Sequence, residues 1–133
     1  MDISKLKTNK DKEQEGVEID VGEGLILRIC RLGNPKYESY VRKIGKPMRH
    51  QLRSGDPDPA QAKDIVIKAC ARHVLVGWEN MQEPDENGEL QDVQYSIQKA
   101  EQLLRDIPDF YRLVLELGND ASLFRDGNDE GNS

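Results

Sequence analysis

The stretch Asp58–Trp78, DPAQAKDIVIKACARHVLVGW, decides the fold predicted for this chain. Asp58 can accept hydrogen bonds from the free N–H groups of a first helical turn, and Pro59 lacks only a donor that such a turn leaves unpaired. Apolar residues then recur in two adjoining helical rows, and only Asp64, Lys68 and Arg72 form a polar stripe. The pattern predicts a central helix over residues 58–80, roughly 30 Å long at the standard helical rise.

Composition favours a single, mainly α domain around this helix. The chain has 133 residues, of which 33% are charged and only 5% aromatic. Its core must therefore come from Leu, Ile, Val and Ala, which is typical of helical domains. Asn34-Pro35 predicts the start of a kinked helix reaching Arg53, Ser96 caps a helix over residues 97–106, and a fourth apolar stripe follows over residues 110–124.

Extended structure is expected mainly near the N-terminus. Val17, Ile19 and Val21 alternate with acidic residues, glycines follow, and residues 25–32 resume the pattern. This predicts a short β-hairpin. A second tight turn is expected at Asn87-Gly88, between short extended arms. The fold class predicted is mainly α, with a short N-terminal β-hairpin and about four helices around the central helix (58–80).

The two ends of the chain differ from the middle in composition. Residues 1–15 have almost no apolar content and predict a flexible arm, and residues 126–133 predict a disordered acidic tail. Residues 16–125 are expected to form the single helical domain. The sequence has neither an apolar run near 18 residues nor a secretory leader, so we expect a soluble cytoplasmic protein that does not bind a membrane.

The core is predicted from helical spacing on the expected helices. Its members are apolar residues that share a face, together with one histidine on the central helix. They are Ile65, Ala69, His73, Val76, Trp78, Leu103, Leu113 and Leu117.

Charge is distributed unevenly along the chain, whose net charge is −6. Residues 28–53 carry eight Lys or Arg and one acidic residue, whereas residues 79–133 carry four and fourteen. Such a layout favours head-to-tail self-association or a partner of matching polarity, although a solvated helix face explains it equally well. The candidate partner-binding residues are Arg42, Lys43, Lys46, Arg49 and Arg53.

Motifs for catalysis, metals or cofactors are missing from the sequence. Cys30, His50, Cys70 and His73 provide only one pair of closely spaced ligands, whereas structural zinc sites use paired close ligands. The two cysteines are expected to be small buried residues without a disulfide. We expect a protein that is not an enzyme and holds no metal or cofactor.

Nucleic-acid binding is the alternative function, because the basic helix over residues 36–53 could neutralise several phosphates. Tyr37 and Tyr40 could stack on bases. Against this, they lie on the helix's apolar stripe, and the acidic remainder of the chain would repel a polyanion.

One run of residues resembles a known family. The run Ile65–Met81, ending in Trp78-Glu79-Asn80, is followed by an Asn-Gly turn, by Val93-Gln94-Tyr95-Ser96 and by a Leu-Leu helix. Together with Ile44–Pro47, it resembles the tail assembly chaperones of long-tailed, non-contractile (siphovirus) bacteriophages, over roughly residues 17–125.

The resemblance implies a small, mainly helical protein that associates with itself. Such a protein coats the phage tape measure protein in the host cytoplasm, helps to recruit tail tube protein during tail assembly, and is absent from the mature virion. Its expected partners are therefore the tape measure protein, the tail tube protein and further copies of itself.

Overall fold

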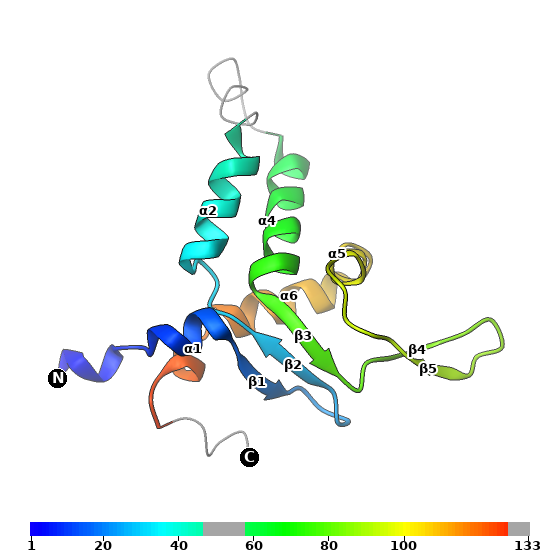
Figure 1. Ribbon diagram of the computed structural model, residues 1–133, viewed down its shortest axis with the longest axis horizontal. Coiled ribbons are helices and arrows are strands. Elements are labelled where there is room, and N and C mark those ends of the chain that lie inside the picture. Colours follow the sequence, from blue (N-terminus) through cyan, green and yellow to red (C-terminus); the bar gives the residue numbers. More distant parts are fainter. Residues whose placement is uncertain (47–57, 128–133) are drawn as a thin grey trace.

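The computed structural model describes residues 1–46 and 58–127. It combines a three-stranded sheet, a pair of helices that project from it, three further α-helices and a separate two-stranded arm (Figure 1). The elements are η1 (Ile3–Leu6), α1 (Lys10–Glu15), β1 (Val17–Asp20), β2 (Ile26–Ile29), α2 (Pro35–Ile44), α4 (Pro59–His73), β3 (Leu75–Glu79), β4 (Gln82–Pro84), β5 (Leu90–Asp92), α5 (Ile97–Asp106), α6 (Pro108–Gly118) and η2 (Ala121–Phe124).

The larger sheet has the strand order β1-β2-β3, and both neighbouring pairs are antiparallel. The predicted N-terminal hairpin is thus present, with Ile19 opposite Leu27 and Val17 opposite Ile29. Alternation along each strand places Ile19, Leu27 and Ile29 in the core. Glu18 and Arg28 lie opposite each other on the other face, 3.5 Å apart between Oε1 and a guanidinium nitrogen.

The prediction of a mainly α fold is wrong, because strands occur in two antiparallel sheets and not only in an N-terminal hairpin. The central helix ends at His73, and Leu75–Glu79 form β3 beside β2. Val74 leaves the helical conformation, and its carbonyl oxygen accepts a hydrogen bond from the Cys30 N–H at 2.8 Å. An apolar run with β-branched residues is compatible with a helix or with a strand. Here it is a strand because it pairs with β2.

The starts of the two projecting helices follow the predicted chemistry. Asn34 and Asp58 accept first-turn N–H bonds, and each is followed by proline. The Asn34 amide also donates to the carbonyl oxygens of Arg31 and His73, both at 2.8 Å, and so joins the start of α2 to the end of α4. The two helices pack side by side (Figure 1). The expected kinked helix beyond Lys46 lies outside the described residues.

The C-terminal helices agree with the sequence pattern. Ser96 caps α5, which has the predicted bounds, and Asp120 caps η2. α5 packs on α4, and α6 packs on α5 and β2. Phe124 of η2 is fully buried, so the core continues to within a few residues of the C-terminal end of the described chain.

The segment expected to be a flexible arm contains η1 and α1. α1 contacts η2, and the Asn9 N–H donates to the Phe124 carbonyl oxygen at 2.6 Å. The Arg31 N–H donates to the carbonyl oxygen of Glu13, which lies in α1. Residues 9–15 are therefore attached to the domain, whereas Ile3 of η1 is 74% exposed.

Among the predicted core residues, Ala69 is fully buried. The rest are half-buried, namely Ile65, His73, Val76, Trp78, Leu103, Leu113 and Leu117. The fully covered positions are their neighbours, including Cys70, Ala71, Leu104 and Val114. α4 is covered by α2 on one side and α5 on another, so residues that face only one of these helices keep part of their surface exposed. Within the described ranges, no helix is long and apolar enough to cross a bilayer.

Candidate partner-binding groove on α2

The described members of the predicted basic set lie on or just after α2. Arg42, Lys43 and Lys46 are exposed, while Arg49 and Arg53 lie outside the described residues. The Arg42 guanidinium donates to the Ser39 hydroxyl at 3.3 Å. Arg42 and Lys46 are four residues apart and share one side of the helical path, whereas Lys43 belongs to a neighbouring stripe.

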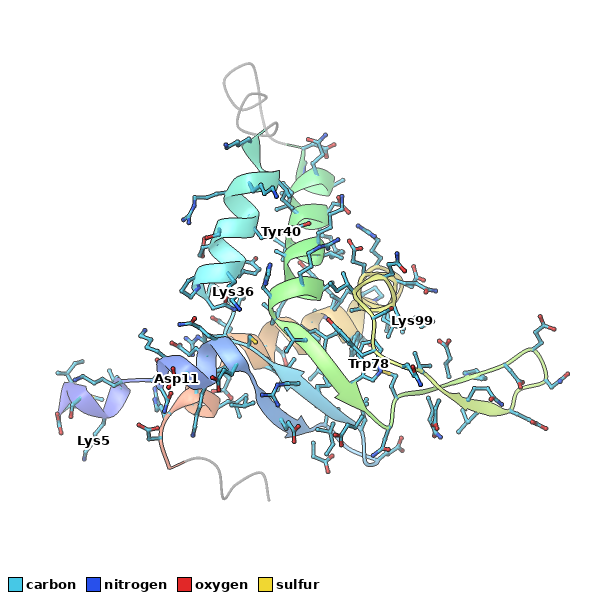
Figure 2. The ribbon with its side chains drawn as sticks, viewed as in Figure 1. Lys5, Asp11, Lys36, Tyr40, Trp78 and Lys99 are labelled. Carbon is cyan, nitrogen blue, oxygen red and sulfur yellow. The ribbon has the colours of Figure 1, made fainter. Side chains whose placement is uncertain are left out.

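This neighbouring stripe lines a groove of about 400 Å³. Its lining residues come from one face of α2 and from the last residue of α4. They are Pro35, Lys36, Ser39, Tyr40, Lys43 and His73. The α2 members follow the three- and four-residue spacing that puts side chains on one helix face, and Figure 2 shows Lys36 and Tyr40 on this helix.

The floor of the groove is fixed by contacts between α2 and α4. The Tyr40 ring meets the His73 ring edge-on, with centroids 5.6 Å apart, and the Arg72 guanidinium lies 5.2 Å from the Tyr40 centroid. Arg72 is itself held by the Lys68 carbonyl oxygen at 2.9 Å and by Glu101 at 3.4 Å. The tyrosine is therefore a positioned wall of the groove rather than a free side chain.

The electrostatic character of the groove is positive. Lys36 and Lys43 stand at its rim, and burial together with the charges of Lys36 and Arg72 lowers the pKa of His73 below its ordinary value. The lowered pKa favours the neutral form of His73 at pH 7. A groove with an aromatic floor and ammonium groups at its rim suits a ligand that is apolar at its centre and anionic at its edge.

The two cysteine thiols are buried and do not line the α2 groove. Cys30 and Cys70 are free and buried, and burial raises the pKa of Cys70 to about 12. The Cys30 thiol donates to the Gln14 carbonyl oxygen at 3.3 Å. Across the residues that the structure describes, no group of three or more His, Cys, Asp or Glu side chains is placed to hold a metal ion. The expectation that the protein is not an enzyme stays a prediction.

A second prominent surface is the arm formed by β4, β5 and their turn, which extends away from the body (Figure 1). Asp85 accepts N–H bonds from Asn87 and Glu89, and Gly88 takes a left-handed conformation, so the predicted Asn-Gly turn is present. Residues 82–92 contain five acidic residues and no basic residue. Leu90 on this arm is 62% exposed.

The run that carries the family resemblance forms the joint between the arm and the body. The Trp78 indole N–H donates to the Val93 carbonyl oxygen at 2.7 Å, and its ring meets Tyr95 edge-on with centroids 4.9 Å apart. The Tyr95 hydroxyl lies 2.9 and 2.8 Å from the carbonyl oxygens of Ala71 and Leu75. Asn80, in a left-handed conformation, donates to Gly24 at 2.9 Å. The residues that carry the resemblance therefore pack together as one structural unit. Within it, Trp78 lies on strand β3 and not on the predicted helix.

Comparison with known families gives one assignment. A family model described as YdaY prophage protein matches residues 32–131. The chain belongs to the YdaY prophage protein family. No curated protein and no solved structure matches it.

The YdaY match contains both surfaces described above. It begins before α2 and ends after η2, so it includes the groove, the arm and the Trp78–Tyr95 joint, whereas α1 and the β1–β2 hairpin precede it. Membership confirms that the protein is of phage origin, which is the coarser part of the resemblance seen in the sequence.

Proposed function

We propose that this YdaY-family protein is a tail assembly chaperone of a long-tailed, non-contractile phage. It binds and coats the tape measure protein in the host cytoplasm, recruits tail tube subunits, associates with itself, and is absent from the mature virion. The observation that carries the proposal is that the most distinctive part of the chaperone-like sequence, from Ile65 to Ser96, lies within the segment matched by a prophage family.

The surfaces of the molecule support this role. A chaperone that later gives way to the tail tube needs several weak contacts whose sum is strong and whose members can be displaced one at a time. The exposed basic side of α2 and the projecting β4–β5 arm provide separate contact regions of opposite charge. We assign partner binding, to the tape measure protein or to further copies of the chain, to the basic set Arg42, Lys43, Lys46, Arg49 and Arg53.

Co-expression with the tape measure protein of the same prophage tests the proposal. We expect the tape measure protein to stay in the soluble fraction and to co-purify with the chaperone. The double reversal Arg42→Glu with Lys46→Glu should lower its recovery, whereas Lys5→Glu with Lys7→Glu, an equal charge change on exposed N-terminal residues, should not. A tape measure protein that remains insoluble with the wild-type chain would refute the chaperone assignment.

The alternative, a small nucleic-acid-binding protein that uses the basic helix 36–53, has less support. Tyr37 is buried in the core, so of the two tyrosines only the half-buried Tyr40, whose ring is packed against His73 and Arg72, keeps any surface for a base. A gel-shift assay at about 100 mM salt, where phosphate-driven binding persists, separates the two functions. A clear shift with duplex or single-stranded DNA would favour the alternative.

A further inference from the structure

The β4–β5 arm has two distinct faces. Strand pairing sets Pro84 opposite Leu90 and Gln82 opposite Asp92, so these four residues share one face. Glu83 lies opposite Gln91 on the other face. The Lys99 ammonium group of α5 (labelled in Figure 2) lies 2.9 Å from the Glu83 carboxylate and fixes the base of the arm. The four residues of the Leu90 face are all exposed.

The Leu90 face complements the groove on α2. Leu90 is the exposed apolar residue of the arm, Asp92 lies beside it, and the turn adds Glu86 and Glu89. The groove has the complementary features. The Tyr40 ring forms an apolar floor for Leu90, and Lys36 and Lys43 at the rim carry the charge opposite to that of the arm carboxylates. The groove is shallow and open to solvent, so it offers Leu90 a contact surface rather than an enclosed pocket.

We propose that the β4–β5 arm of one molecule docks in the α2 groove of a second copy, with Leu90 on the floor and the arm carboxylates against Lys36 and Lys43. The occupant is a second copy because the same chain carries both complementary surfaces. This inference deepens the proposed function, since it names the contact through which the chaperone associates with itself.

The geometry makes the association head-to-tail. Arm and groove are different surfaces, so each molecule that donates its arm keeps a free groove, and each that fills its groove keeps a free arm. Successive copies then form a closed ring or an open helical row. One hairpin buries little surface, so each contact is weak, and many copies arranged along a long partner gain strength from multiplicity.

Sedimentation of the purified full chain, without tape measure protein, tests the contact. We expect the wild type to shift from monomer to larger species as concentration rises. This shift should weaken between about 0.1 and 1 M salt, because screening shortens the reach of the charges from about 10 to about 3 Å. A wild type that stays monomeric at every concentration overturns the proposal, while co-expression with the tape measure protein still tests the chaperone role on its own.

Two single-surface variants identify the surfaces. Leu90→Ser with Asp92→Asn should abolish the shift, while Gln91→Lys, an equal charge change on the opposite arm face, should keep it. Lys36→Glu with Lys43→Glu should also abolish it, and Lys5→Glu with Lys7→Glu should not. Circular dichroism checks that each variant is folded. If either single-surface variant folds and still associates like the wild type, the proposal fails.

Mixing the two defective variants tests the head-to-tail arrangement. The arm variant keeps its groove and the groove variant keeps its arm, so the mixture should yield a 1:1 dimer that grows no further. A mixture that stays monomeric refutes the contact. As a second measurement, Ser39→Cys with Leu90→Cys should form intermolecular disulfides under a mild oxidant, and the control Ser39→Cys with Gln91→Cys should form far fewer. Equal cross-linking in both would also count against the assigned arm face.

Discussion

At the scale of single residues, Tyr95 shows how one hydroxyl secures several elements. Its ring packs against Trp78 of β3, and its oxygen lies within hydrogen-bonding distance of the carbonyls of Ala71 in α4 and Leu75 in β3. The last turn of a helix leaves carbonyl groups without partners inside the helix. Tyr95 supplies a donor at the point where α4 gives way to β3.

Removing that hydroxyl should be costly. We expect Tyr95→Phe to lower the free energy of unfolding by about 1 to 2 kcal/mol, because a part-buried carbonyl loses its donor. Urea denaturation followed by circular dichroism measures the change. Tyr111→Phe is the matched control, since the Tyr111 hydroxyl makes no hydrogen bond to the described residues, and it should change the free energy little. Equal losses in the two variants would contradict the role assigned to Tyr95.

His73 should make stability depend on pH. Its native pKa lies below the ordinary value of 6.5, mainly through burial, so the unfolded chain takes up a proton at a higher pH than the native protein does. The contribution is therefore fully present above about pH 6.5 and is lost as the pH falls through that value towards the native pKa. Comparing urea unfolding at about pH 7.5 and about pH 5.5, we expect a smaller loss for His73→Gln than for the wild type. Equal losses would argue against it.

At the scale of elements, the junction of α4 with β3 depends on a close approach by α6. The Leu32 N–H donates to the Gly118 carbonyl oxygen at 2.8 Å. A Cβ added at Gly118 would lie 3.1 Å from Val74 Cγ1, 3.3 Å from Leu32 Cβ and 3.4 Å from Leu32 N. Val74 is fully buried, and Leu32 is held by its backbone bond, so neither neighbour has room to move.

Gly118→Ala should therefore destabilise the protein although alanine is the better helix former. Overpacking costs typically about 1 to 3 kcal/mol, whereas the gain in helix propensity is about 1 kcal/mol. We expect a net loss of about 1 kcal/mol in urea unfolding. Glu116→Ala, at an exposed position of the same helix, should be close to neutral. A more stable Gly118→Ala variant would show that α6 can move away from Leu32.

Elements that begin with a capping residue or contain a turn motif could be predicted from the sequence. Asn34, Asp58 and Ser96 cap their helices as expected, and the turn at Asn87-Gly88 forms. The strand β3 could not be predicted, because its apolar residues continue the helical rows of α4 and only its pairing with β2 reveals it. Long-range pairing of this kind leaves no signal in a short window of sequence.

The candidate groove was predictable only in part. Lys43 belonged to the basic set, but Lys36 and Tyr40 are grouped with it only because His73 of α4 closes the same hollow. His73 was expected in the core, but it is half-buried and lines the groove, where its ring meets Tyr40 edge-on. The position of His73 on the apolar face of the helix is compatible with a buried or a half-buried side chain. The packing of α2 on α4 determines which of the two occurs.

At the scale of the whole molecule, contacts join α1, near the N-terminal end, to η2, the last described element. Phe124 of η2 is fully buried, its carbonyl oxygen accepts the Asn9 N–H, and the Arg31 guanidinium lies 5.7 Å from its ring centroid. α1 and η2 therefore close the fold together, although they lie at opposite ends of the sequence.

Phe124→Ala should consequently affect the entire domain. Truncating a fully buried phenylalanine typically costs about 3 to 5 kcal/mol, through lost burial and the cavity left behind. We expect a single cooperative transition at lower urea concentration, with α1 and the body unfolding together. Leu123→Ala, at a half-buried neighbour, should cost less. A near-normal transition midpoint for Phe124→Ala would mean that η2 detaches without disturbing the core.

The contact of α1 with η2 also means that the chain is almost a closed loop. The Asn9 side-chain amide donates to the Asp126 carboxylate at 2.7 Å, so residues 9 and 126 lie next to each other. A short linker joining residue 126 to residue 9, with new ends at Asn87-Gly88, would give a circular permutant whose core connectivity is intact. In that permutant no turn connects β4 to β5. The contribution of the intact acidic arm can then be measured separately from the folding of the body, without replacing a side chain.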